Sequence, residues 1–335
     1  MTVKNNLKYS DELNYIEINC SDISDTGKRL DLYISLQLPQ YSRSFIKKTI
    51  EENKVFVNED ICFKAGYKVQ LQDKIKFPEL EYKPNSVDLF KAKFDLEIIS
   101  EDEDYLFINK PINLAVHPTS SMSEITLVNK LLGLYSDLPS NDFRRPGIVH
   151  RLDKDTSGVI VIAKNPKSLW WLSRQFANRK VHKKYVSIGV DFQAEKKLQV
   201  GSEFEVQGMM KRNTLNRKQF FISTDEKSGK FSYSRFLVKS IKEVGLSKLY
   251  LLEIYPLTGR THQIRVHQKS IDLPILGDKI YLSRKQMQWS DKFLQDNAYV
   301  RRLYLHAKSI SFENYNGNLY SVETKVPEEF CHILS

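Results

Sequence analysis

Residues 147–163 read Gly-Ile-Val-His-Arg-Leu-Asp-Lys-Asp-Thr-Ser-Gly-Val-Ile-Val-Ile-Ala, a charged segment that runs directly into an apolar one. The apolar end, Val159–Ala163, is short and rich in β-branched residues, which predicts a buried strand. Rigid strands commonly carry functional loops at their ends. We therefore expect the charged segment to hold reactive side chains against a core strand.

Two other interpretations of this charged segment are a calcium loop and a capped turn. Its acidic and small residues match positions 1, 3, 5 and 6 of an EF-hand loop: Asp153, Asp155, Ser157 and Gly158. The twelfth position, which needs an acidic ligand, is Lys164, and a strand follows instead of a helix, so we exclude calcium. A turn capped by its own Asp, Thr and Ser side chains remains open on local sequence alone.

A second charged segment reads Thr-Gly-Arg-Thr-His-Gln-Ile-Arg-Val-His at 258–267. Its two histidines are five positions apart without a carboxylate between them, which excludes the zinc-protease pattern. If Thr261 opens a helix, His262 and Arg265 share one face, which suits phosphate binding or pairing with a carboxylate. A solvated basic turn is the alternative interpretation.

The composition points to a basic protein with thiols in a reducing environment. Over 335 residues, 51 Lys and Arg face 41 Asp and Glu, a formal charge of +10 that favours a nucleic-acid partner. The three cysteines form no C-x-x-C pair, which excludes a thiolate zinc site and a disulfide framework. The N-terminus resembles no signal peptide, and the apolar runs are too short to span a membrane. We expect a cytoplasmic protein without a metal or a membrane partner.

Composition shifts divide the chain into four segments. We expect a polar leader at 1–27, a compact α/β unit at 28–77, a linker at 78–94 and a larger α+β domain at 95–335. The linker contains two prolines and many charges. The compact unit is predicted to begin with a short helix, followed by a second helix with one buried face: Phe45, Ile46, Thr49 and Ile50. An alternating strand is expected over 54–58.

The motifs, taken in order, resemble the RluA-type family of pseudouridine synthases. The pattern His-Arg-Leu-Asp-x-x-Thr-Ser-Gly stands intact at 150–158, and Gly-Arg-Thr-His-Gln-Ile-Arg-Val-His stands at 259–267. The shorter elements are Lys110-Pro111 with His117-Pro118, Lys183-Lys184-Tyr185, Pro274-Ile275-Leu276-Gly277-Asp278 with Tyr281, and Leu305-His306-Ala307. The resemblance covers roughly residues 96–330.

The N-terminal unit, 28–77, resembles the alpha-L RNA-binding module known from a ribosomal small-subunit protein. Arg29-Leu30-Asp31, Ser42-Arg43-Ser44, Val55-Phe56-Val57-Asn58 and Asp73-Lys74-Ile75 carry this match. Other residues depart from both patterns by standing where glycine is common: Asn53, Glu59, Gln72 and Asn113, with Asp272-Leu273 before Pro274. Because side chains disfavour left-handed backbone, these departures predict altered turns.

The resemblance implies a catalytic domain built on a large, mainly antiparallel mixed sheet with flanking helices, and an enzyme that isomerises uridine in RNA. It implies Asp153 as the catalytic carboxylate. Burial would favour a neutral acid, so an ionised Asp153 needs a cationic partner, for which Arg265 is the candidate. Tyr185, which on its own would be an ordinary core residue, would lie against the uracil. Residues expected to bind substrate or RNA are Lys110, His150, Arg151, Thr156, Arg260, His262 and His306, with Arg29, Arg43, Lys47 and Lys48 in the N-terminal unit.

An isomerisation neither adds nor removes atoms, so the resemblance implies no cofactor and no metal. The expected partner is ribosomal RNA of the large subunit, with transfer RNA as the alternative, and the expected state is a monomer. Two other functions stay open on the residues alone. One is a non-catalytic RNA-binding factor in ribosome assembly, and the other is a nucleoside hydrolase that uses the same carboxylate. Product analysis separates them.

Overall fold

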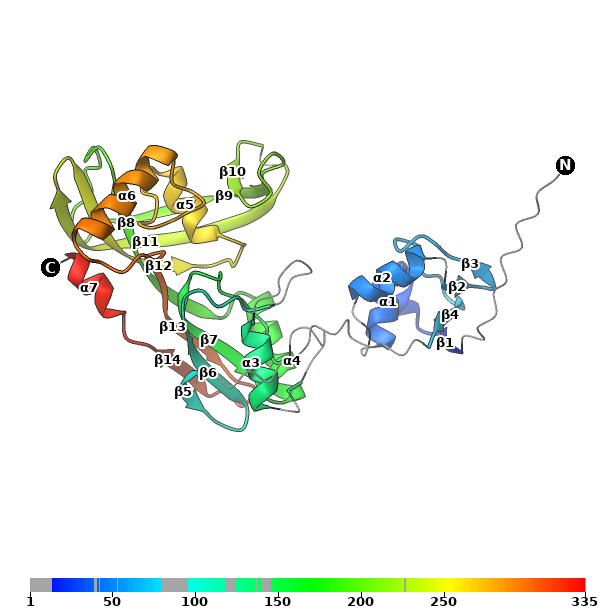
Figure 1. Ribbon diagram of the computed structural model, residues 1–335. Coiled ribbons are helices and arrows are strands. Elements are labelled where there is room, and N and C mark those ends of the chain that lie inside the picture. The colour runs from blue at the N-terminus through cyan, green and yellow to red at the C-terminus, as the bar shows by residue number, and fades with distance from the viewer. Residues whose placement is uncertain are drawn as a thin grey trace. The chain divides into compact units, whose positions relative to one another are not determined.

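The computed structural model describes residues 14–38, 41, 43–52, 54–79, 96–117, 125–135, 138–139, 146–225 and 227–334. These residues fall into two compact units, 14–79 and 96–334, which Figure 1 labels by element. Only Pro78 and Glu79 of the predicted linker lie within the described residues. No described helix combines the length and the apolar character that a membrane span requires.

The N-terminal unit packs two helices against a four-stranded sheet. Its elements are β1 (Tyr15–Asn19), η1 (Ile23–Asp25), α1 (Leu30–Gln37), α2 (Arg43–Glu51), β2 (Phe56–Val57), β3 (Asp60–Ile61) and β4 (Lys74–Pro78). The strands follow the order β1-β4-β2-β3 and all pair antiparallel. The predicted unit, 28–77, leaves out β1, because that strand pairs with β4 more than fifty positions along the chain, a contact that local sequence does not reveal.

The predicted helix over residues 43–51 forms and buries the expected face. Ile46, Thr49 and Ile50 are buried, and Phe45 is half-buried. They join a core with Leu30 and other apolar residues of α1. Lysines on the opposite side remain exposed, so this helix presents positive charge to solvent.

The second unit is built on one ten-stranded sheet, which confirms the predicted α+β class. The strands are β5 (Glu97–Glu101), β6 (Tyr105–Lys110), β7 (Ser157–Ala163), β8 (His182–Asp191), β9 (Glu203–Arg212), β10 (Phe220–Ser223), β11 (Lys230–Val244), β12 (Ser247–Pro256), β13 (Leu305–Glu313) and β14 (Leu319–Glu323). They follow the order β10-β9-β11-β12-β8-β13-β7-β6-β5, with β14 on β13. The β13–β7 pair is parallel and the other pairs are antiparallel, so the sheet is mixed and mainly antiparallel.

Five helices accompany this sheet: α3 (Leu127–Leu134), α4 (Pro166–Ala177), α5 (Gln263–Ser270), α6 (Arg284–Asp296) and α7 (Glu328–Leu334). Local sequence explains how α4 and α6 begin. Asn165 accepts a hydrogen bond from the Ser168 amide ahead of Pro166, and Ser283 forms a reciprocal cap with Gln286. Figure 1 shows α5 and α6 beside the long strands β9, β11 and β12.

The predicted strand after the charged segment is confirmed as β7, and every residue of it is buried. Ile160 and Ile162 pack in one cluster with Leu127 of α3, while Val159 and Val161 pack in another with Leu172 of α4. Because helices cover both faces, the strand is apolar throughout and does not alternate. The loop that precedes β7 is therefore attached to the most enclosed strand of this part of the sheet.

Gly158 stands at the point where β7 meets β13. Its φ is +114°, and a Cβ atom there would overlap the carbonyl oxygen of Ala307. The parallel pairing of His306 with Ser157 and of Ala307 with Gly158 thus depends on a residue without a side chain.

The turns in which glycine is replaced keep left-handed geometry. The φ angles are +72° at Glu59, +72° at Gln72 and +61° at Asn113. The expectation that these departures alter the turns is wrong for these three residues. Left-handed backbone costs about 1–2 kcal/mol at most residues with a Cβ, and Asn is among the exceptions. Asn53 lies outside the described residues.

Candidate active site

A buried lysine at the end of β6 holds the loop of Asp153 in place. Lys110 is fully buried at the end of β6, and its ammonium donates to the carbonyl oxygens of Pro111 (2.7 Å), Leu114 (2.9 Å) and Lys154 (3.1 Å). Burial lowers the pKa of Lys110 to about 7. With its side chain enclosed, Lys110 orients the loop and does not reach RNA, which corrects the sequence-based expectation.

Arg265 holds two carboxylates at once. Its NH1 donates to Oδ2 of Asp153 at 3.2 Å, while Nε and NH2 donate to the two carboxylate oxygens of Asp278 at 2.8 Å each. The arginine side chain is only 4% exposed, against 17% for Asp153 and none for Asp278. The expected pairing of Asp153 with Arg265 is present, but the tighter, bidentate partner is Asp278.

This arrangement determines the electrostatics of the guanidinium. Burial alone would lower the pKa of Arg265, but the hydrogen bonds and charge of Asp278, followed by the charge of Asp153, raise it above its ordinary value. Asp278 therefore fixes the plane of the guanidinium and leaves one N–H directed at Asp153.

His262 approaches Asp153 from the other side, with Nε2 at 3.8 Å from Oδ2. Phe220 donates its amide hydrogen to the Tyr281 hydroxyl, which leaves the hydroxyl hydrogen to donate to His262 Nδ1 at 2.9 Å. Burial lowers the pKa of His262, so the ring is neutral at pH 7. The neutral ring consequently presents Nε2–H toward Asp153.

The predicted helical face shared by His262 and Arg265 is wrong. The helix α5 begins at Gln263, and His262 caps it in the left-handed region with a φ of +56°. The two side chains still converge on Asp153, because the turn at His262 redirects its ring. A helical pattern could not reveal this geometry.

Tyr185 lies on β8 and lines the same cavity as Asp153, which has a volume of about 100 Å³. Burial, with a further contribution from the charge of Asp153, raises the pKa of its phenol above the ordinary value. The hydroxyl is therefore protonated at pH 7 and can act as a hydrogen-bond donor. Arg151 and Arg260 line this cavity as well.

Three other predicted residues support the loop from inside the protein. The His306 ring is buried and its Nδ1 lies 2.8 Å from Oγ of Ser157. His150 accepts a hydrogen bond from the Val161 amide on Nε2 at 3.1 Å, and its ring stacks on Phe176. Thr156 is buried and donates its amide hydrogen to the Asp153 carbonyl at 3.1 Å.

The predicted RNA-binding residues 29, 43, 47 and 48 belong to the N-terminal unit. Arg29 Nε donates to Asp31 at 3.0 Å and is partly exposed. Lys47 and Lys48 form exposed pairs with Glu51 and Glu52, each at 3.5 Å. The side chain of Arg43 lies outside the described residues.

The sequence-based prediction did not place Asp278 and Tyr281 in the site, although both belong to the family motifs. It also missed Arg302, which donates to the Ser157 hydroxyl and to Glu329 of α7. The Gly277-Asp278 pair was a usable signal for the first two. No local pattern pointed to Arg302.

Comparison with known proteins accounts for both units. Residues 104–270 match the RNA pseudouridylate synthase family model, and residues 28–75 match the S4 domain. In a solved structure, Human RNA Pseudouridylate Synthase Domain Containing 1, the same fold recurs with a TM-score of 0.54 and 23% identity, over 69% of this chain and 83% of that one.

Curated relatives extend the match to nearly the whole chain. An uncharacterized RNA pseudouridine synthase of Aquifex aeolicus is 38% identical over 76% of this chain and 77% of its own length. The ribosomal large subunit pseudouridine synthase D of Escherichia coli is 32% identical over 92% of this chain and 90% of its own length. The resemblance to the RluA-type enzymes is confirmed, and the chain belongs to the RNA pseudouridylate synthase family, the isomerases that convert uridine in RNA to pseudouridine.

Proposed function

We propose that this chain forms pseudouridine in ribosomal RNA of the large subunit, with Asp153 as the catalytic carboxylate. The observation that carries the role of Asp153 is its contact with a buried arginine that a second carboxylate already fixes. Relatives named for large-subunit ribosomal RNA, together with the N-terminal S4 domain, support that RNA over transfer RNA.

The reaction detaches uracil from ribose, turns it and rejoins it through carbon 5. In our proposal Asp153 acts on the uridine held in its cavity, while Arg265 keeps the carboxylate oriented. Tyr185 lies against the uracil face, where base–aromatic stacking contributes about 1–3 kcal/mol. Its protonated hydroxyl is available for proton transfer at carbon 5.

The target uridine must leave its stack to enter a cavity of about 100 Å³, which costs a few kcal/mol. Arg151 is exposed at the rim of this cavity. We infer that its guanidinium occupies the space that the base leaves in the RNA. Arg151→Ala is then expected to lower turnover on structured RNA by roughly tenfold or more, and normal turnover would contradict this role.

The decisive experiment compares the wild type with Asp153→Asn on ribosomal RNA and on transfer RNA, and it maps pseudouridine in the products. We expect a loss of at least roughly 10⁴-fold in single-turnover rate on ribosomal RNA, with little change in RNA affinity. Asp155→Asn in the same loop is the matched control and should retain activity within a few-fold.

Product identity separates the alternatives. Free uracil would show hydrolysis, and unchanged RNA with tight binding would show a non-catalytic factor. Pseudouridine formed only in transfer RNA would keep the chemistry and overturn the proposed target. Full activity of Asp153→Asn would remove Asp153 from the mechanism.

A further inference from the structure

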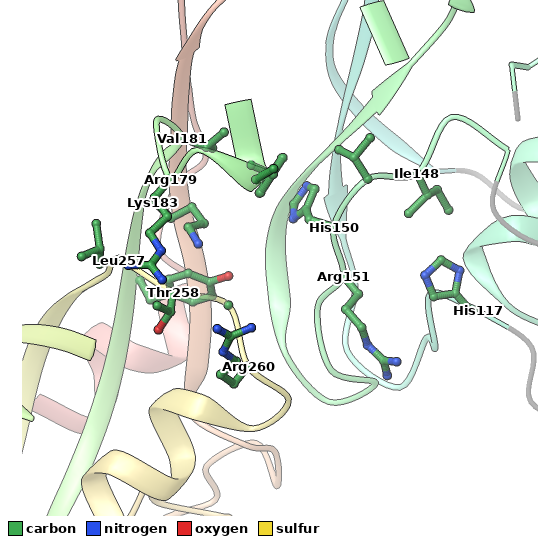
Figure 2. Close-up of a pocket in the computed structure, with 15 residues that line it drawn as sticks. His117, Ile148, His150, Arg151, Arg179, Val181, Lys183, Leu257, Thr258 and Arg260 are labelled. Atoms are coloured by element: carbon green, nitrogen blue, oxygen red, sulfur yellow. The ribbon is translucent and has the colours of Figure 1, made fainter. Parts of the chain in front are cut away.

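A second cavity, of about 500 Å³, adjoins the Asp153 cavity and shares part of its wall. Figure 2 shows Ile148, His150 and Arg151 along one side of it, and Lys183 with Arg260 along the other. Arg151, Lys183 and Arg260 line both cavities. A molecule bound in the smaller cavity can therefore extend directly into the larger one.

Positive charge dominates this second cavity. Arg151, Arg179, Lys183 and Arg260 line it, and no Asp or Glu stands among its described lining residues. A cavity walled by several cations without a carboxylate is matched to an anion, and RNA supplies one at every nucleotide.

Lys183 is the cation most enclosed within this cavity. Within the described part of the chain, no carboxylate is paired with its ammonium, which lies 5.9 Å from the centroid of the Phe176 ring. Burial lowers the pKa of Lys183 to about 8, and the lysine charge in turn contributes to a lowered pKa at His150. A buried ammonium without a counterion is costly unless an anion joins it.

We propose that Lys183 binds a phosphate of the RNA backbone next to the target uridine, in a subsite distinct from the cavity that takes the base. This inference rests on the proposed function. A uridine beside Asp153 is covalently joined to its two flanking phosphates, and the shared wall at Lys183 brings one of them within reach. Lys183 is thus a binding residue that fixes the position of the RNA backbone beside the target uridine.

The titration of Lys183 gives this subsite a signature. The groups that face it are His117, His150, Arg151, Phe176, Arg179, Tyr185 and Arg260, with Asp153 in the adjoining cavity. Burial lowers the pKa of His150 to about 3 and raises that of Tyr185, so neither titrates near pH 8. RNA affinity should be constant below pH 8 and fall by up to about tenfold per pH unit above it, because binding must then take up a proton.

The test measures affinity for the ribosomal RNA fragment that the wild type modifies. A second set of fragments carries one uncharged methylphosphonate, on the 5′ or on the 3′ side of the target uridine. Lys183→Met should weaken binding of the normal RNA about tenfold, and Lys183→Arg should restore most of it. Lys184→Met is the matched control, since neighbouring side chains of a strand point to opposite faces, and it should change affinity less than twofold.

On one of the two methylphosphonate fragments, Lys183→Met should cause no further loss, because the charge that it contacts is already absent. Equal losses on all fragments would overturn the proposal. If Lys183→Met does not fold, the wild type alone decides: its affinity decline above pH 8 must vanish on one of the two methylphosphonate fragments, and persistence on both overturns the subsite. Failure of the wild type to form pseudouridine in any RNA would instead contradict the proposed function.

Discussion

Lys47 and Lys48 in the N-terminal unit, and Arg265 in the catalytic domain, are all cations beside carboxylates. The side chains of Lys47 and Lys48 are 54% and 75% exposed, and their glutamate partners lie one helical turn away. Arg265 is 4% exposed and lies between two aspartates from distant loops. Exposed pairs are held weakly and exchange partners easily, whereas a buried network fixes geometry. In our proposal the two units thus use charge for different purposes, one to attract RNA and the other to orient the reacting Asp153.

The largest expected difference is in stability. Asp278→Asn removes the bidentate charge from buried Arg265 and should lower the free energy of unfolding of the catalytic domain by about 3–5 kcal/mol. Glu51→Gln, which breaks an exposed pair with Lys47, should cost less than about 0.5 kcal/mol. Urea unfolding measures both free energies. Tryptophan fluorescence follows the catalytic domain, which contains Trp170, Trp171 and Trp289, and amide NMR signals follow the N-terminal unit. Comparable losses of unfolding free energy in Asp278→Asn and Glu51→Gln would contradict the different roles of charge in the two units.

The second largest expected difference between the units is their loss of stability at low pH. Burial, and then the charge of Arg302, lowers the pKa of His306 to about 4, so the folded protein binds this proton less well than the unfolded chain. The catalytic domain should lose about 3 kcal/mol as the pH falls from 6.5 to 4, from this histidine alone. All seven histidines lie beyond residue 116, so the N-terminal unit lacks this loss.

The measurement is the free energy of unfolding as a function of pH, followed by fluorescence for the catalytic domain and by amide NMR signals for the N-terminal unit. His306→Asn should remove its own share of the acid loss in the catalytic domain and leave the share of the other buried histidines, His150 and His267. The same slope in both units would mean that other groups control it.

The smallest expected effect concerns RNA affinity. The double variant Lys47→Gln, Lys48→Gln should weaken RNA binding roughly tenfold and reduce the slope of log affinity against log salt by about 0.7–0.9 per lost phosphate contact. The single-turnover rate at saturating RNA should not change, because the proposed reacting groups belong to the other unit. A lower rate at saturation would assign these lysines a part in the chemistry.

Much of the fold was predictable, because β7 and α2 carry strong local patterns. The apolar, β-branched run after Gly158 predicts a buried strand, and the spacing of Ile46 and Ile50 predicts one buried helical face. The strand β1 lies within the segment assigned as a polar leader, because its pairing with β4 depends on a distant contact.

The site was predictable in membership but not in geometry. The pairing of Asp153 with Arg265 followed from the family motifs, whereas the stronger hold of Asp278 on the same arginine depends on a turn at Gly277 with a φ of +75°. For Lys110, the motif identified a residue of the site but predicted the wrong role. A lysine in a motif predicts a contact with RNA, but only tertiary structure reveals that its ammonium is enclosed by three carbonyl oxygens.

The parallel pairing of β7 with β13 has a consequence for biosynthesis. Ser157 and His306, which meet there, are 149 positions apart in the chain. When the Asp153 loop of a nascent polypeptide has been synthesised, its neighbouring strand β13 has not, and 149 further positions must be translated before His306 can pair with Ser157. If Asp153 acts as proposed, the growing chain cannot complete this site, and cannot modify RNA, until β13 has been synthesised.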